Sequence, residues 1–363
     1  MIKSFDEVFK DVTKLGAKMK TDEYHPAGKY QIIDQGQEAV AGYTDLEEGV
    51  FENVPAIVFG DHTRIVKYVA QPFFLGADGV KVLRSRFKDA NYRYLYYALK
   101  NVKIPNTGYN RHFKWLKEAE INYPSSEEQS KIVSILDEIS SVIEHRQQQL
   151  QKLDELVKAR FVELFGDPLS NDKGWQKVLI TEVCHAIFGG GTPSKSHPEY
   201  FTGSIPWVSP KDMKSLAIND SIDHITEEAI AHSTTNLVPA NSVLMVIRSG
   251  ILKHTLPVAI NSLPVTINQD MKAFVPNDTV KTAFLMYFFK AIENDVLAGV
   301  RGVTADNIDF KAFQKRTIIV PPLALQEQFA AFVTQTDKSK AAIQKALNET
   351  QVLFDSLMQK YFD

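Results

Sequence analysis

The fold is decided by SSEEQSKIVSILDEISSVIEHRQQQLQKLDELVKARFVELF, residues 125–165. Its apolar side chains recur at alternating steps of three and four residues, and Arg146 and Arg160 fill the remaining positions of the repeat. A heptad pattern of this length needs another helix to cover its apolar stripe. It predicts one helix of about 40 residues, roughly 60 Å long. The apolar positions are Ile132, Leu136, Ile139, Ile143, Leu150, Leu153, Val157 and Leu164.

A partner for this helix is present in the same chain. Residues 322–363 show the same spacing, interrupted by Thr336, Lys340 and Thr350. We therefore predict an antiparallel coiled coil that acts as a spacer, with a helical pair that only dimerises the protein as the alternative. The residues expected to pack between the helices are Leu136, Ile143, Leu150, Val157, Val333, Ile343, Leu347 and Phe354.

The chain contains an internal repeat. At an offset of 197 residues, the sequence NTGYNRHFKWLKEAEINYP (106–124) aligns with VRGVTADNIDFKAFQKRTIIVP (300–321) and continues into both helices. The starts of the two halves align at an offset of 175, with FDEV (5–8) beside ITEV (180–183). Two copies of so large a unit indicate a duplicated architecture and not a solenoid. The matched pairs include Phe113 with Phe310, Lys114 with Lys311, Ile121 with Ile318, Pro124 with Pro321, and Gln129 with Gln326.

The repeat defines four segments. Residues 1–123 and 167–321 are predicted to be globular domains, and residues 124–166 and 322–363 are the long helices. β-Branched runs such as VPAIVFG (54–60) and NSVLMVIRS (241–249) indicate strands. Each domain closes with an aromatic-rich helix, at 92–102 and 283–294, whose rings are better explained by core packing than by base stacking. The predicted fold class is α/β (mixed α+β), with a pseudo-two-fold internal repeat.

The charge pattern limits how this chain could bind DNA. The formal net charge is −3. Residues 1–123 carry 18 Lys and Arg against 16 Asp and Glu, giving +2, whereas residues 124–166 carry 5 against 8, giving −3. Any DNA affinity must then come from locally clustered cations or from partner subunits, because neutralisation of phosphates dominates such affinity. No apolar run is long enough to span a membrane, and the charged N-terminus does not resemble a signal peptide, so we expect a cytoplasmic protein.

Motifs for catalysis are missing from the sequence. An adenine methyltransferase needs an Asp/Asn-Pro-Pro-aromatic loop, and the candidates at 167–169 and 320–323 do not match it. The glycines of 189–195 are not in the order of a P-loop, and the histidines show no metal-ligand spacing. A single cysteine excludes an internal disulfide framework. We predict a non-catalytic chain without a metal site, with a nuclease of unrecognised carboxylates as one alternative.

Loops rich in Gly, Ser, Thr, Lys and Arg are the candidate DNA contacts. The loop GGGTPSKSH (189–197) offers backbone amides, hydroxyls and a lysine to phosphate oxygens or base edges. Similar residues occur in the turn 61–64, at 108–114, and after the predicted strand at 241–249. A solvated turn is the alternative interpretation of each. The candidates are His62, Arg64, Arg111, His112, Lys114, Thr192, Ser194, Lys195, Arg248, Lys253 and Lys311.

The order of these modules resembles the specificity subunit of type I restriction-modification systems. GGGTPSKSHPEYFTGSIPWVSPKDM (189–213) is similar to the opening of many target-recognition domains, and VFGDHTRIVKYVAQPFFLGADGVKVL (58–83) is similar to another recurrent version. The Pro-x4-Gln start and the heptads of 124–165 and 321–362 resemble the family's central and distal spacers. This resemblance spans the whole chain.

The resemblance implies two target-recognition domains that each read one half of a bipartite double-stranded DNA site. It implies methyltransferase subunits that carry S-adenosylmethionine and flip an adenine for N6 methylation. It also implies restriction subunits that use ATP and Mg²⁺ for translocation and cleavage, so that no cofactor is expected in this chain. A specificity subunit of another methylation-based defence system, and a coiled-coil adaptor that binds only protein, remain as alternatives.

Overall fold

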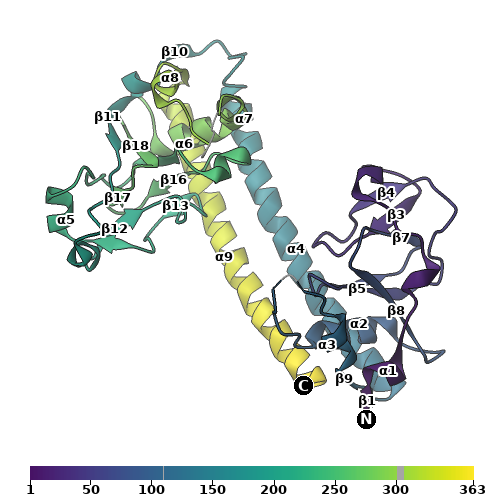
Figure 1. The fold of residues 1–363 in the computed structure, drawn as a ribbon. Coiled ribbons are helices and arrows are strands. Elements are labelled where there is room, and N and C mark those ends of the chain that lie inside the picture. Colours follow the sequence, from purple (N-terminus) through teal and green to yellow (C-terminus); the bar gives the residue numbers. More distant parts are fainter. Residues whose placement is uncertain (109, 301–305) are drawn as a thin grey trace. The chain divides into compact units, whose positions relative to one another are not determined.

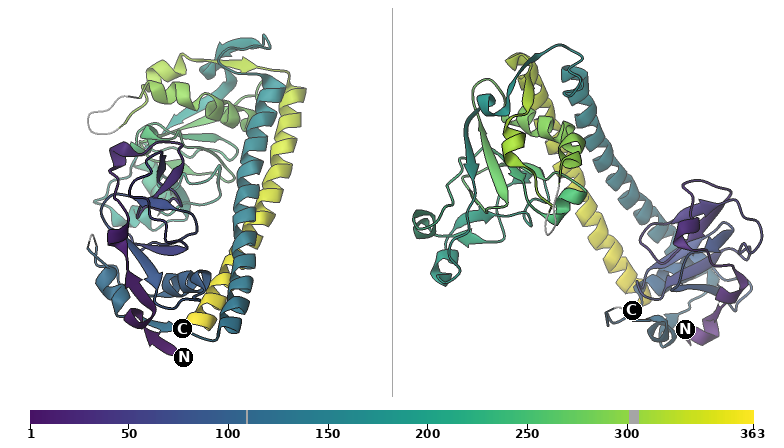
Figure 2. Two further views of the ribbon diagram at one scale, coloured as in Figure 1. Left: turned by 90° about the vertical axis from the view of Figure 1, so that its right-hand side faces the viewer. Right: turned by 45° about the horizontal axis from the view of Figure 1, so that its top comes forward.

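The structure, a computed structural model, describes residues 1–108, 110–300 and 306–363 and is drawn in Figures 1 and 2. The chain divides into two compact units: unit 1 is Met1–Gln147 with Gln344–Asp363, and unit 2 is Gln148–Ile343. Each unit contains one globular domain and half of each long helix. The repeat segments 106–124 and 300–321 lie partly outside the described residues, at Tyr109 and at 301–305.

The two predicted long helices are present as α4 (Ser126–Phe165) and α9 (Leu323–Phe362), which lie side by side in Figures 1 and 2. In unit 1, the Arg146 guanidinium donates to the backbone carbonyl of Ala346 and to the Thr350 hydroxyl. In unit 2, Lys340 Nζ lies 2.5 Å from a carboxylate oxygen of Asp154. Later residues of α4 thus meet earlier residues of α9, and the predicted antiparallel coiled coil is confirmed.

Burial along this helix pair is uneven. The residues predicted to pack between the helices form a seam. Its outer members are buried because each also packs into the hydrophobic core of its unit; they are Leu136, Val157, Val333 and Phe354. The central seam residues are only half-buried. Each helix half is therefore fixed to a globular domain and not only to the other helix. The half-buried seam residues are Ile143, Leu150, Ile343 and Leu347.

The described residues of unit 1 form three small sheets. Their strand orders are β1-β9, β2-β8-β5-β6 and β4-β3-β7. In the last sheet, β3 pairs antiparallel with β4 and parallel with β7. The strands and short helices of unit 1 are β1 Ile2–Ser4, α1 Phe5–Val8, β2 Phe9–Asp11, β3 Tyr30–Ile33, β4 Gly42–Thr44, β5 Ala56–Gly60, β6 Val66–Val69, β7 Phe73–Leu75, β8 Val80–Ser85, α2 Tyr92–Asn101, α3 Phe113–Lys117 and β9 Glu120–Asn122.

Unit 2 repeats this topology with one strand, β13, added at the edge of the largest sheet. Its sheets are β10-β19, β11-β18-β15-β16-β13 and β14-β12-β17, and the last again combines one antiparallel and one parallel pair. The predicted internal repeat and mixed α/β class are thus confirmed. The main elements of unit 2 are β10 Gln176–Leu179, β11 Cys184–Gly189, β12 Ile205–Val208, β13 Ala217–Ile218, β14 His224–Ile225, α5 Glu227–Ala231, β15 Val243–Val246, β16 Val258–Asn261, β17 Thr266–Ile267, β18 Met271–Pro276, α6 Thr282–Ala291, α7 Glu293–Ala298, α8 Phe310–Gln314 and β19 Thr317–Val320.

Aromatic side chains of α2 and α6 join each domain to a long helix. In unit 1, Arg93 and Tyr97 of α2 both donate to the carboxylate of Asp137 on α4, and burial together with this hydrogen bond raises the pKa of Tyr97 to about 12. In unit 2, Phe284 of α6 packs on Phe161 of α4, with ring centroids 5.7 Å apart. These contacts agree with core packing as the explanation of the aromatic repeats.

The Pro-x4-Gln signature of both long helices has one structural explanation. The Gln129 side-chain amide donates to the Pro124 carbonyl at 3.0 Å, and the Gln326 amide donates to the Pro321 carbonyl at 2.8 Å. Gln326 also accepts from the backbone N–H of Lys281 at 2.8 Å. Both glutamines are buried, so the amides satisfy backbone groups where the chain enters each helix.

We expect the substitution Gln326→Ala to destabilise unit 2 by about 3 kcal/mol, because it leaves buried backbone groups without hydrogen-bond partners. For a unit of this size, the thermal unfolding midpoint falls by roughly 10 °C. Circular dichroism melting measures this change. Gln328→Ala is the matched control, since Gln328 is exposed on the same helical turn. Equal midpoints for the two variants would contradict the role assigned to Gln326.

Candidate nucleic-acid interface

The turn between β5 and β6 is the best-defined candidate loop of unit 1. Asp61 is buried, and its carboxylate accepts a hydrogen bond from the backbone N–H of Phe113 at 2.7 Å. The Asp61 carbonyl also accepts from the backbone of His112 at 2.7 Å. Arg64, in the left-handed region at φ 64°, donates from Nη1 to the Ile104 carbonyl at 3.3 Å. The turn is therefore held against α3 and the loop before it.

One predicted contact in this region does not fit the structure. His112 has no solvent-exposed surface, and its Nδ1 lies 3.0 Å from the Asp61 carbonyl oxygen. Its Nε2 lies 3.4 Å from the Thr107 hydroxyl. A ring that is buried and bonded at both nitrogens positions the loop and cannot reach DNA. The neighbouring Arg111 and Lys114 are exposed.

Gln35, which the sequence reasoning did not single out, links three loops of unit 1. Its Oε1 accepts from the backbone N–H of His62 at 3.1 Å, and its Nε2 donates to the Asp78 carbonyl at 3.0 Å. The Thr63 hydroxyl donates to the Gln35 carbonyl at 2.6 Å. Gly79, next to the Gln35 amide, adopts φ 89°, a left-handed conformation that favours glycine. The loops that follow β3, β5 and β7 thus converge on one surface.

In unit 2, the glycines of the GGG segment have a packing role that the sequence reasoning missed. Gly191 donates its N–H to the Ile267 carbonyl and accepts from Trp207 Nε1, both at 3.0 Å. A Cβ on Gly190 would lie 1.8 Å from the Asn268 carbonyl oxygen. The expectation that these backbone amides are offered to DNA is therefore wrong for Gly191. Close packing between loop backbones explains the glycines.

The polar residues that follow are exposed. The Thr192 hydroxyl donates to the side-chain oxygen of Gln269, and the Ser194 hydroxyl lies 2.7 Å from that of Ser196. Lys195 is exposed and has no ion-pair partner in the described parts of the chain. Thr192 and Gln269 thus tie the loop after β11 to the turn between β17 and β18.

Arg248 is held by an acidic neighbour. Its Nε and Nη2 lie 2.6 and 2.5 Å from Oδ1 of Asp270, and the backbone N–H of Arg248 donates to the Asp270 carbonyl at 3.2 Å. About half of the Arg248 side chain remains exposed. Lys253 lies 3.9 Å from Asp306 and is more exposed. Arg248 is therefore oriented but still accessible.

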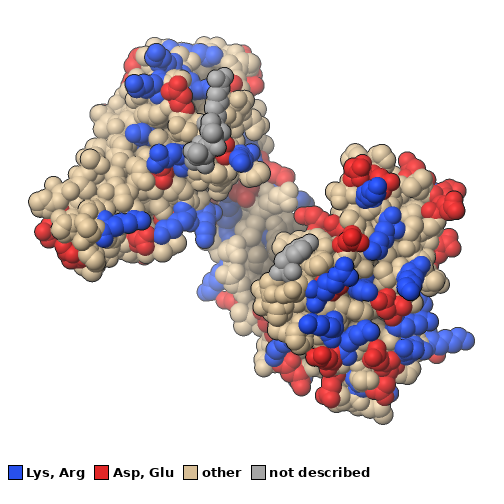
Figure 3. Space-filling view, viewed as in Figure 1, with Lys and Arg blue, Asp and Glu red and all other residues tan. Residues whose placement is uncertain are grey.

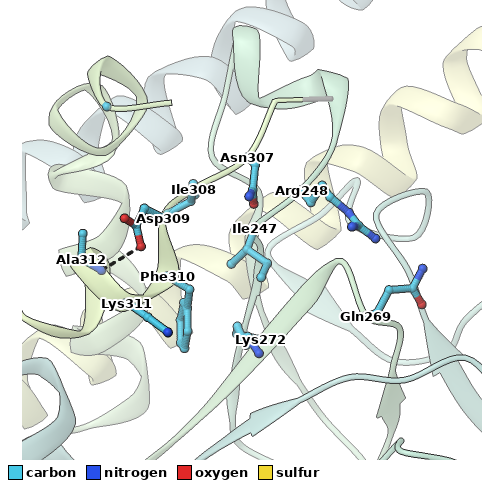
Figure 4. A pocket seen from close by; sticks show the side chains of 11 residues that line it. Ile247, Arg248, Gln269, Lys272, Asn307, Ile308, Asp309, Phe310, Lys311 and Ala312 are labelled. Carbon is cyan, nitrogen blue, oxygen red and sulfur yellow. Dashed lines mark hydrogen bonds between the residues drawn. The ribbon is translucent and has the colours of Figure 1, made fainter. Parts of the chain in front are cut away.

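A pocket of about 910 Å³ brings two predicted contacts, Arg248 and Lys311, together with two residues that the sequence reasoning missed, Gln269 and Lys272. Figure 4 shows their side chains around one opening. The pocket is lined by both polar and apolar side chains. The other lining residues are Ile247, Gly299, Asn307, Ile308, Asp309, Phe310 and Ala312.

The surface charge agrees with the near-neutral composition. Figure 3 shows Lys and Arg mixed with Asp and Glu on the drawn face, without a continuous basic surface. Among the described residues, no group of three or more His, Cys, Asp and Glu side chains could hold a metal ion. No helix in the described ranges is long and apolar enough to cross a membrane.

Comparisons with known proteins give one consistent family. The Escherichia coli type I restriction enzyme EcoR124I/EcoR124II specificity subunit is 30% identical over 353 residues, covering 91% of this chain and 84% of that relative. The MjaIX specificity subunit of Methanocaldococcus jannaschii is 33% identical over 121 residues, covering 32% of this chain and 27% of that relative.

Solved structures and a family model agree with these relatives. The crystal structure of a type I restriction-modification S subunit from M. genitalium covers 100% of this chain and 96% of its own, with a TM-score of 0.62 at 18% identity, and so supports the fold. The family model, described as the type I restriction modification DNA specificity domain, matches residues 2–155 and 172–350. Because the two segments matched by the family model span most of the sequence, the chain belongs to the specificity subunits of type I restriction-modification systems.

Proposed function

We propose that this chain reads a bipartite, asymmetric DNA site, with one half read by unit 1 and the other by unit 2. The observation that carries the proposal is the repeated topology of the two units. The strand orders of their scaffolds correspond except for β13, which unit 2 adds at the edge of its largest sheet, whereas the loops on them differ in sequence and in contacts. A repeated scaffold with different loops suits the recognition of two different half-sites.

The loops assigned to this reading are those with accessible polar side chains. In unit 1 they are the turn at 61–64 and the segment around Arg111, which are joined to each other through Asp61. In unit 2 they are the loop 192–195 and the pocket that contains Arg248 and Gln269. Arginine and glutamine are suited to base edges in the major groove, and the lysines are suited to phosphates.

The long helices serve as the spacer between half-sites in this proposal. Methyltransferase subunits would bind the subunit and supply S-adenosylmethionine and the adenine-binding loop, and restriction subunits would supply ATP-driven cleavage. The chain itself would contribute recognition without catalysis. Since its net charge is −3, much of the attraction for DNA phosphates would come from the partners.

The test is co-expression of this chain with the methyltransferase subunit encoded beside it, followed by genome-wide mapping of N6-methyladenine by single-molecule sequencing. We expect one split motif, with two defined halves separated by a fixed number of unspecified bases. A stable complex that binds S-adenosylmethionine and leaves the DNA unmethylated would overturn the proposal in favour of a protein-binding adaptor.

A further inference from the structure

The two units share a lysine–phenylalanine contact at equivalent places. Lys272 is the second residue of β18, and its Nζ lies 4.9 Å from the centroid of the Phe310 ring. Lys81 is the second residue of β8, and its Nζ lies 4.9 Å from the centroid of the Phe113 ring. The strands occupy the same position in their sheets, since β18 lies between β11 and β15 as β8 lies between β2 and β5.

A second lysine follows each phenylalanine. Lys114 and Lys311 are exposed and are aligned by the same 197-residue offset as the phenylalanines that precede them. In unit 2, Lys272 and Lys311 both line the pocket described above, and Figure 4 shows them with the Phe310 ring drawn between them. Each unit therefore places a lysine of a central strand over the phenylalanine that begins a short helix, and an exposed lysine is the next residue of that helix.

The surroundings leave the ammonium groups of unit 2 available and pair one of those in unit 1 with a carboxylate. In the pocket of unit 2, the carboxylate of Asp309 accepts a hydrogen bond from the backbone N–H of Ala312 at 3.1 Å and thus caps α8. Neither Lys272 nor Lys311 has an ion-pair partner within residues 1–108, 110–300 and 306–363. In unit 1, Lys81 lies 3.1 Å from Asp11, which partly neutralises it. Lys114 Nζ lies 4.6 Å from the centroid of the Trp115 ring, and Lys117 Nζ lies 5.4 Å from that of Phe113.

Because both units have these lysines, the lysines are unsuited to distinguishing two different half-sites. The sugar–phosphate backbone, by contrast, is the same in both half-sites, and contacts to it fix the protein on the duplex without reading sequence. An ammonium group is a compact charge without the planar fork of arginine, so that it binds a phosphate oxygen as a point charge. The repeated lysines thus suit contact with the DNA backbone, whereas the different neighbouring loops suit the reading of sequence.

We propose that Lys272 with Lys311, and Lys81 with Lys114, form two equivalent sites for the DNA sugar–phosphate backbone, one for each half-site. This inference rests on the proposed reading of a bipartite site and adds a sequence-independent contact to it. Specificity then resides in the loops that differ, such as the turn at 61–64 and the segment around Arg248.

The experiment measures binding of the purified complex with its methyltransferase subunits to a target duplex and to a scrambled duplex, by fluorescence anisotropy over a range of salt concentrations. The main variants are Lys311→Gln and Lys114→Gln, because both side chains are exposed and their loss leaves the fold intact. Each variant should lower the slope of log affinity against log salt by about 0.9. At about 0.15 M salt, Kd should rise roughly fivefold for both duplexes.

The double variant Lys272→Gln with Lys311→Gln should lower the slope by about 1.8 and leave the methylated motif unchanged. Lys311→Arg, which keeps the charge, should retain the slope of the unmodified complex. Lys214→Gln is the matched control, since Lys214 is an exposed lysine of unit 2 away from this pocket, and its slope should equal that of the unmodified complex.

Three results would overturn the inference. An unchanged salt slope in the glutamine variants would show that these lysines do not contact phosphates. A changed motif, or weaker binding of the target duplex alone, would show that they read bases. Loss of methyltransferase subunits on size exclusion would assign the lysines to a protein interface. These results differ from a failure of the proposed function itself, in which case the unmodified complex would produce no split motif.

Discussion

A chain that carries one extra heptad in each long helix is expected to methylate a split motif whose gap is wider by about three base pairs. Insertion of seven residues after Gln148 in α4 and after Ile343 in α9 preserves the spacing of the apolar seam. Each insert adds about 10 Å of helix, and one base pair of duplex occupies about 3.4 Å. The two defined halves of the motif should stay the same, because the reading loops are untouched.

Mapping of N6-methyladenine in cells that co-express the methyltransferase subunit gives the gap directly. The matched control is the same insert in α4 alone, which leaves one helix seven residues longer than its partner and removes the pairing of Arg146 with Thr350 or of Asp154 with Lys340. We expect this control to lose methylation. An unchanged gap in the chain with both inserts would contradict the spacer role of the helices.

The second large effect is expected in the core of unit 2. Phe161 of α4 packs against the rings of Phe165, Phe284 and Phe329, with centroids 5.0, 5.7 and 5.5 Å away. Only 2% of its surface is exposed. Phe161→Ala should therefore destabilise unit 2 by about 4 kcal/mol, because it removes buried aromatic surface and leaves a cavity. Denaturant unfolding followed by circular dichroism measures the loss.

Val162→Ala is the matched control, since the next residue on the same helix is 53% exposed. It should change the free energy of unfolding by less than about 0.5 kcal/mol. If Phe161→Ala were as mild as this control, the packing of α4 into the domain core would not be what stabilises unit 2. The variant also tests function, because a loosened domain should lower methylation of the whole split motif.

The repeat and the helices could be predicted because their signals are periodic. Heptad spacing depends only on helix geometry, and so residues such as Leu136 and Val333 were assigned to the interface without knowledge of the domains. The strand boundaries within residues 265–275 have no comparable periodic signal. This segment contains two strands, β17 and β18, separated by Asn268, Gln269 and Asp270, since side-chain hydrogen bonds of Asn268 and Asp270 favour a turn.

The candidate site was less predictable for a different reason. His112 looks like a polar loop residue in the sequence, but the tertiary fold buries it against the Asp61 carbonyl. Lys272 lies inside a β-branched run and carries no local sign of a site. Only comparison of its strand position with that of Lys81 in the other unit distinguishes it. Long-range packing decides whether such residues are buried or lie at a site, and the residues next to them in the sequence do not reveal that packing.

The division of the chain has a consequence for its synthesis. Unit 2 is continuous from Gln148 to Ile343, whereas unit 1 needs the distant segment 344–363. In its core, Phe354 and Met358 pack with Ile132 and Leu136. On the ribosome, the first domain to emerge must therefore hold an apolar helix stripe uncovered until residues 344–363 have been made. The domain made second should be the first to complete its fold.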